Sequence, residues 1–375
     1  MITNPFIITE KVIPEYFCDR KDDMHELIQL LQNGNNVVLI SNRRVGKTGL
    51  IQYCFQHSKL TDDYTCIYLD ILSTTNLQEF TFLLGREVFD TIRSKAGSLW
   101  QSFISIVKSL SGKIGFDPYS GLPTLNIQLG DIVHPEYTLK EIFQYLSVSP
   151  KPCIVAIDEF QQIAEYPEKN VEALIRSHLL QINNCRMIFS GSERHILGEM
   201  FTNNARPFYQ SASFIELNVI PQEIYVNFIV DMFENFGKSI NKNIAKEIYE
   251  KFDGVTFYVQ RVCNGVFANT ESGGEVTDKI FHQTLDEILS SYDVIYRTTL
   301  SELTTRQKEL LLAVSQNKSV VNITSVEFLQ RYSLTSSSAV QTAMKALQKK
   351  HLITRNGDSY RLDDQFLRLW LNLHY

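Results

Sequence analysis

The sequence lacks any long hydrophobic run. Nowhere do about 18 apolar residues follow one another, the length that a membrane-spanning helix needs. The chain starts MITNPFIITEKVIPEY, which has neither the basic region nor the long apolar stretch of a secretory signal. We therefore expect a cytoplasmic protein with no membrane partner.

Cysteine is scarce and scattered. The six cysteines form no C-x-x-C pair, and most stand inside apolar runs, as reduced core cysteines do. This arrangement indicates neither a zinc site nor a disulfide framework. The residues are Cys18, Cys54, Cys66, Cys153, Cys185 and Cys263.

A strong excess of one charge is also missing. The chain has 36 Lys and Arg against 42 Asp and Glu, a net charge of -6, which argues against a surface built entirely for nucleic acid. Residues 301–375 differ, with ten basic and six acidic side chains, so any basic surface is local to that segment. The length of 375 residues suffices for two or three folded domains.

Short apolar runs alternate with stretches of helical period through the first 220 residues. This alternation predicts an α/β domain with a parallel sheet covered by helices. The predicted strands are 36–41, 66–71, 153–160, 186–191 and 213–217.

An excursion separates the second and third of these strands. Two helices are predicted within residues 76–110, followed by a hairpin that turns at Asp117 to Pro123. We interpret about 97–136 as an insertion on the core domain. Its aromatic residues either cover core, which base rates favour, or line a partner surface.

The strand pattern stops after Leu217. Residues 221–300 show apolar spacing of i, i+3, i+4, which predicts a helical lid domain. Residues 301–375 predict three helices and then two short strands around Asn356-Gly357, the pattern of a winged helix-turn-helix. The predicted domains are therefore 1–220, 221–300 and 301–375.

The segment SNRRVGKTGL follows the first strand and opens a helix, the context of a phosphate-binding P-loop. Main-chain N–H groups from Arg44 to Thr48 are expected to surround a phosphate, and Gly46 is needed because a side chain there would block the phosphate or oppose a positive φ. Lys47 would contact the β and γ oxygens, and Thr48 would ligate Mg²⁺. Ser41 stands where the full pattern has its first glycine.

The run IVAIDEF supplies two carboxylates at the end of a buried strand. Asp158 is expected at the carboxyl edge of the sheet, where it would reach the Mg²⁺ through water. Glu159 would orient or deprotonate the attacking water. Together with the P-loop, this pair predicts nucleotide hydrolysis.

Polar residues after the next strand are further candidates. Ser190 or Ser192 would contact the γ-phosphate or the water, although serine is also common in strand-end turns. Arg194 or Arg206 would act as an arginine finger, and surface solvation is the alternative for both.

Several of these segments resemble the archaeal-type ATPases of the STAND group, which are similar to AAA+ ATPases in their core. They are FCDR (17–20), NRRVGKT (42–48), VAIDEFQ (155–161), FSGS (189–192), RPFYQS (206–211) and the terminal LDDQFLRLWL. The resemblance implies a P-loop core, a helical lid and a winged helix that act as an ATP-driven switch.

The resemblance also implies roles for individual residues. Phe17 and Arg20 would border the nucleotide base. ATP or ADP would be bound by Arg20, Arg44, Val45, Gly46, Lys47, Thr48 and Gly49, with Mg²⁺ at Thr48 and Asp158. Catalysis would fall to Asp158 and Glu159, and Ser192 and Arg206 join them as the candidates identified above from the residues themselves. In the lid, Thr256 replaces a usual proline, Phe257 stands near the place of a sensor arginine, and Arg261 comes one turn later, so we expect slow hydrolysis.

Three functions remain open. A switch ATPase would couple nucleotide state to a winged helix that recruits a protein partner or a second copy. A DNA-binding regulator, similar to origin-recognition ATPases, would place helix 336–350 in the major groove of double-stranded DNA. A nucleotide-binding scaffold is the third, and phosphate release separates it from the others. Candidate DNA contacts are Ser337, Gln341, Thr342, Lys345, Lys349, Lys350 and Arg355.

Overall fold

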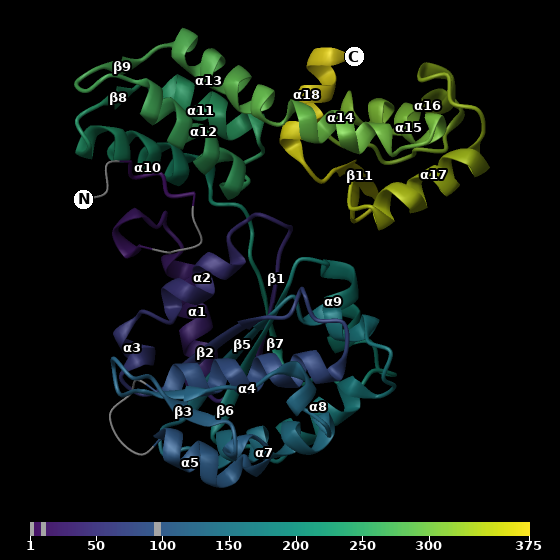
Figure 1. Cartoon of the computed structure of the whole chain (residues 1–375). Coiled ribbons are helices and arrows are strands. Elements are labelled where there is room, and N and C mark those ends of the chain that lie inside the picture. The colour runs from purple at the N-terminus through teal and green to yellow at the C-terminus, as the bar shows by residue number, and fades with distance from the viewer. Residues whose placement is uncertain (1–3, 9–12, 94–98) are drawn as a thin grey trace. The chain divides into compact units, whose positions relative to one another are not determined.

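The computed structural model describes residues 4–8, 13–93 and 99–375 (Figure 1). The chain divides into two compact units. The sheet unit is Thr9–Val219, and the helical unit combines Met1–Ile8 with Ile220–Tyr375.

Five parallel strands form the sheet of the sheet unit, in the order β2-β5-β6-β1-β7. Each strand predicted from the sequence is present, with ends that differ by at most two residues. The α/β prediction is therefore confirmed. The strands are β1 (Val37–Ile40), β2 (Thr65–Asp70), β5 (Cys153–Asp158), β6 (Cys185–Gly191) and β7 (Ser213–Glu216).

Helices cover both faces of this sheet, which is why its strands are apolar throughout rather than alternating. Successive residues of β1 point to opposite faces: Val37 and Leu39 belong to one buried cluster and Val38 to the other. The first cluster includes α1 (Lys21–Gln32), α2 (Lys47–Cys54) and α3 (Ser58–Thr61). The second includes α4 (Leu77–Arg93), α7 (Pro135–Val148), α8 (Val171–Leu179) and α9 (Arg194–Thr202).

The predicted excursion between β2 and β5 is also present. Helices α5 (Leu99–Ile106) and α6 (Lys108–Ser111) precede an antiparallel hairpin of β3 (Ile114–Phe116) and β4 (Pro123–Leu125). Residues 97 and 98, where we placed the start of the insertion, lie outside the described residues. The expectation that its aromatic residues cover core holds for Phe103, which is buried, but is wrong for Phe116 and Tyr119, which are 62% and 98% exposed at the hairpin turn.

The first half of the helical unit is the predicted bundle. The helix predicted up to residue 300 is broken at Tyr292, which ends one helix and caps the next. Two strands that we did not predict, β8 (Ser239–Ile240) and β9 (Glu275–Val276), pair in parallel. The helices are α10 (Gln222–Asn235), α11 (Lys242–Lys251), α12 (Thr256–Asn269), α13 (Asp278–Ser291) and α14 (Asp293–Ser301).

Residues 4–8 also belong to this unit, although the sequence led us to place them with the core domain. Phe6 is buried, with its ring centroid 5.2 Å from that of Phe233 and 6.1 Å from that of Phe267. Asn264 Nδ2 donates to the Phe6 carbonyl at 2.7 Å. The N-terminal segment is thus fixed by apolar packing that no local pattern signalled.

The second half of the helical unit has the winged-helix arrangement. A backbone bridge between Val320 and Tyr360 adds a third short strand position to the wing. The C-terminal segment, for which we predicted no helix, forms α18. The elements are α15 (Thr305–Ser315), α16 (Val326–Arg331), α17 (Ser337–Lys349), β10 (Ile353–Asn356), β11 (Ser359–Leu362) and α18 (Gln365–His374).

Two sequence-based expectations concern the whole chain. All six cysteines are free, and all but Cys66 are buried, in keeping with reduced core residues. Within the described ranges, no helix combines the length and the apolar character needed to cross a membrane.

Candidate functional site

The loop between β1 and α2 has the backbone of a phosphate cradle. Arg44 and Gly46 both have positive φ, of 66° and 104°. Left-handed residues of this kind let successive N–H groups turn toward one side of a loop. A Cβ on Gly46 would meet no protein atom within 4 Å, and the positive φ is by itself a reason for glycine at this position. Gly46 then caps α2, whose N-terminal dipole favours an anion.

Lys47 is buried at the start of α2. Its Nζ donates to Ser41 Oγ at 3.2 Å, so the serine that replaces the usual glycine has a direct contact with the P-loop lysine. Burial lowers the pKa of Lys47, and the nearby charges of Asp158 and Glu159 oppose that shift. The ammonium is therefore poorly compensated by protein groups alone, as expected of a group that binds an anionic ligand.

Asp158 ends the fully buried strand β5 and lies beside the P-loop helix. Its Oδ2 accepts hydrogen bonds from Thr48 Oγ1 at 2.7 Å and from Tyr68 OH at 3.0 Å. The structure thus brings together Thr48 and Asp158, the two residues that we expected to share a metal ion. Tyr68, on the neighbouring strand β2, was not predicted. Burial, followed by the charge of Asp158, raises the pKa of this tyrosine, which keeps it a hydrogen-bond donor.

Glu159 has a left-handed backbone conformation, with φ of 56°, where the chain leaves β5. Its Oε2 accepts from Ser192 Oγ at 2.9 Å, from the Ser192 N–H at 3.3 Å and from Gln161 Nε2. Arg43 Nε in turn donates to Ser192 Oγ at 3.3 Å. Ser192 is thus joined to both the carboxylate and the phosphate loop. Sequence reasoning missed Gln161 and Arg43, although both lie inside motifs that it identified.

The other polar candidates near β6 lie elsewhere. Ser190 is fully buried, and its Oγ has no hydrogen-bond partner among the described residues. Arg194 pairs with Glu216. Arg206 makes a two-atom contact with Glu172 on α8, through Nε at 3.2 Å and through Nη2. The arginines are therefore held by carboxylates, and an arginine-finger role would require either pair to open.

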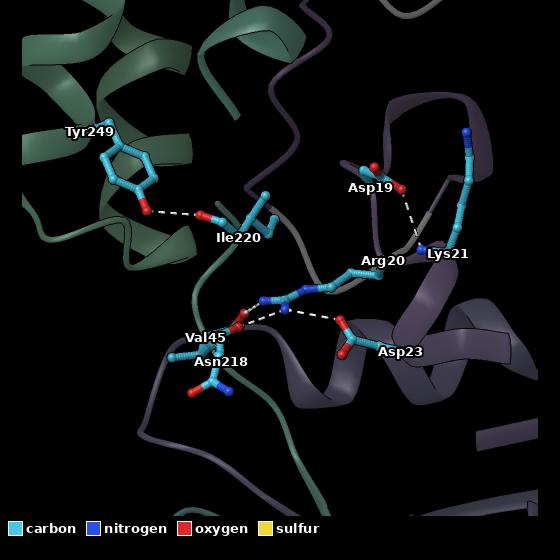
Figure 2. Close-up of polar contacts among 8 residues, drawn as sticks. All are labelled: Asp19, Arg20, Lys21, Asp23, Val45, Asn218, Ile220 and Tyr249. Carbon is cyan, nitrogen blue, oxygen red and sulfur yellow. Dashed lines mark hydrogen bonds and ion pairs between the residues drawn. The ribbon is translucent and has the colours of Figure 1, made fainter. Parts of the chain in front are cut away.

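The FCDR motif contacts the elements on either side of the phosphate loop. Arg20 is buried and donates to the carbonyls of Val45 at 3.0 Å and of Asn218 at 2.6 Å, as Figure 2 shows. The Phe17 ring stacks on that of Tyr53 in α2, with centroids 4.6 Å apart. Arg20 thus contacts the phosphate loop itself, whereas Phe17 packs on the helix that follows the loop.

The lid motif GVTFY lies in the helical unit, where Thr256 begins α12 at the place of the usual proline. The next aromatic residue, Tyr258, is buried, and its hydroxyl accepts from the Gln365 N–H at 3.0 Å and donates to the Asp363 carbonyl at 3.1 Å. The start of the lid helix is therefore bonded to the start of α18. Phe257 is 40% exposed and Arg261 is half-buried on α12.

The winged-helix candidates form an exposed face. Ser337, Gln341, Lys345 and Lys349 repeat every four residues on α17, so they share one side of the helix. Thr342 and Lys350 are exposed as well. Arg355 is on β10, but its Nε donates to the Gly357 carbonyl at 2.8 Å, within the wing turn.

Comparisons with known proteins agree with this architecture. A family described as "ATPase domain predominantly from Archaea" matches residues 17–262, and one described as "probable winged helix domain" matches residues 294–373. None of the curated protein sequences matches the chain.

Solved structures share the fold at low sequence identity. A Walker-type ATPase of Pyrococcus abyssi has a TM-score of 0.66 and 18% identity, over 98% of this chain and 99% of that one. The Aeropyrum pernix ORC2 protein, in complexes with ADPNP and ADP, has a TM-score of 0.61 and 14% identity, over 98% and 97%. The Aeropyrum pernix ORC1 protein in complex with DNA has a TM-score of 0.51 and 12% identity, over 99% and 96%.

The family match covers more than half of the 375 residues, including the phosphate loop, both strand-end carboxylates and the lid motif. The chain therefore belongs to the family of ATPase domains found predominantly in Archaea.

Proposed function

We propose that this protein binds ATP with Mg²⁺ and hydrolyses it slowly. The observation that carries the proposal is the hydrogen bond from Thr48 Oγ1 to Asp158 Oδ2, because these two oxygens are the ones that an ATPase uses to hold its metal ion. Lys47 is buried beside them with a lowered pKa, so a triphosphate would relieve an unfavourable ammonium.

Each group has a distinct role in this proposal. Gly46 and its neighbours would bind phosphate oxygens through N–H groups, and Lys47 would neutralise the β and γ oxygens. Thr48 and Asp158 would hold Mg²⁺, which neutralises charge that develops during phosphoryl transfer. Glu159 would take the proton of the attacking water, with Ser192 fixing its carboxylate.

We further propose a STAND-type switch built from a core (1–220), a lid (221–300) and a winged helix (301–375). Within the helical unit, lid and winged helix are joined by partly buried polar contacts. Arg368 of α18 donates to the Lys251 carbonyl at 3.3 Å, and Tyr258 bonds to Asp363. Burial lowers the pKa of Arg368, and its Nε also donates to the Gln365 side-chain oxygen at 2.8 Å. We infer that lid and winged helix respond to nucleotide as one body.

Calorimetry with ATP and Mg²⁺, followed by a phosphate-release assay, tests the proposal. We expect heat of binding and slow release of phosphate. Heat without release would favour the nucleotide-binding scaffold. No heat with ATP or ADP would refute nucleotide binding altogether.

The second candidate function is binding of double-stranded DNA through the winged helix. It is supported by the exposed face of α17, which carries Lys345 and Lys349, and by the likeness to the ORC1 protein that was solved with DNA. Phosphate contacts make such binding depend strongly on salt. A salt titration of duplex binding by the full chain tests this function, and no affinity at low salt would leave a protein partner or self-association as the role of the winged helix.

A further inference from the structure

Arg20 is a buried guanidinium whose partners are mostly uncharged. Only 6% of the residue is exposed. It donates to two main-chain carbonyls, those of Val45 and Asn218, and to a single carboxylate, that of Asp23 at 3.2 Å (Figure 2). Burying a charged group is costly unless each of its donors is well placed. Packing alone therefore does not account for a buried arginine at this position.

The bond to Val45 acts on the phosphate loop itself. The peptide that joins Val45 to Gly46 is trans, so its C=O and N–H point in opposite directions. A donor that holds the Val45 carbonyl on one side thereby directs the Gly46 N–H to the other. Gly46 has a positive φ and no Cβ, which makes this peptide one of the easiest in the loop to rotate.

The remaining bonds hold the guanidinium in place. Asn218 lies just after β7, the strand that pairs with β1, and Asp23 is in the first turn of α1. Since β7 pairs with β1, which leads into the loop, and α1 packs beside α2, which follows it, Arg20 is held by neighbours of both elements that flank the loop. A fixed guanidinium can orient a soft peptide, whereas a mobile one cannot.

We propose that Arg20 is a positioning residue for the phosphate tail of the nucleotide: it fixes the Val45–Gly46 peptide so that the Gly46 N–H faces the anion. The inference rests on the proposed nucleotide binding and deepens it. It differs from the role that the family resemblance implies, in which Arg20 borders the base. The two roles make different predictions for a ligand that has phosphates but no base.

The test compares ATP with inorganic tripolyphosphate, each with Mg²⁺, on wild type and on Arg20→Ala. Loss of one hydrogen bond between the Gly46 N–H and a charged phosphate corresponds to about a tenfold change in affinity. We expect R20A to weaken ATP and tripolyphosphate alike, by about tenfold. R20K should lose about threefold, because an ammonium keeps the charge but lacks the planar fork that reaches two carbonyls.

A matched control separates positioning from general stability. Arg186 also donates to two main-chain carbonyls, of Asn183 at 3.0 Å and Cys185 at 2.9 Å, but at the start of β6 and thus at the opposite edge of the sheet. We expect R186A to leave both affinities unchanged and to lower the unfolding temperature less than R20A does, because Arg186 is only half-buried and both of its bonds are local. If R20A fails to fold, R20K and R186A still give the comparison.

Other outcomes would overturn the inference. Weaker binding of ATP with unchanged binding of tripolyphosphate would assign Arg20 to the base. Unchanged affinity of R20A for both ligands would show that Arg20 does not orient the phosphate loop. If wild type binds no adenine nucleotide at all, the proposed function fails instead.

Discussion

Replacing Glu159 by glutamine should stop ATP turnover without weakening ATP binding. The substitution keeps the size and shape of the side chain and removes one negative charge. That charge is the proton acceptor in the proposed reaction, and removing it also reduces repulsion of the triphosphate. Affinity for ATP should therefore be equal to that of the wild type, or tighter.

The hydrogen bonds that Glu159 accepts determine how much the substitution should lower the free energy of unfolding. Glu159 Oε2 accepts three hydrogen bonds, two from Ser192 at 2.9 and 3.3 Å and one from Gln161 Nε2. A bond to a charged acceptor contributes about 1.5 to 3 kcal/mol and a neutral one about 0.5 to 1.5 kcal/mol, so about 1 kcal/mol is lost per bond. Glu159 is only half-buried, which reduces the total to about 1 kcal/mol. The unfolding temperature should fall by about 2 to 4 °C.

The expected effect on turnover is larger. A general base contributes about 10² to 10⁴ in rate, or about 2.7 to 5.4 kcal/mol in the barrier. This difference in scale means that a loss of turnover in E159Q cannot be attributed to unfolding at 25 °C.

The assay measures phosphate release and calorimetric affinity on the same preparations. Asp70→Asn is the matched control, because Asp70 ends the neighbouring strand in register with Asp158 and is exposed. It removes the same charge at the same sheet edge. If D70N loses as much turnover as E159Q, or if E159Q loses binding and turnover equally, the assignment of Glu159 as the base is refuted.

Three further predictions concern the loop and the winged helix. Lys47→Met should abolish ATP binding yet raise the free energy of unfolding without nucleotide. Burial lowers the pKa of Lys47 below its ordinary 10.5, so the unfolded chain binds this proton more tightly, and the wild type should gain stability relative to K47M as pH rises toward 10.5. A destabilised K47M would contradict this. Gly46→Ala should cost about 1 to 2 kcal/mol in thermal unfolding, from φ alone, and an unchanged melting curve would exclude strain at that residue. If α17 binds duplex DNA, K345Q with K349Q should reduce the salt slope by about 2, whereas K279Q on α13 should leave it unchanged.

Local patterns were sufficient for much of the fold. A run such as CIVAID has no polar face, which identifies a strand covered on both sides, and β5 is buried throughout. The hairpin at Asp117 and the winged-helix order of elements were likewise predicted by turn residues and helical spacing. Patterns of this kind extend over a few residues and are set by backbone preferences, so the sequence displays them directly.

The sequence by itself determined where a phosphate loop forms and which residues we propose for the chemistry, because a strand, a glycine loop and a helix in succession define a phosphate cradle without any distant contact. Only the tertiary structure decided their partners. Tyr68 reaches Asp158 because β2 pairs with β5, and Arg20 reaches Val45 because α1 packs beside α2. Strand order and helix packing are long-range properties that depend on how whole faces bury their apolar surface, and no local pattern encodes them.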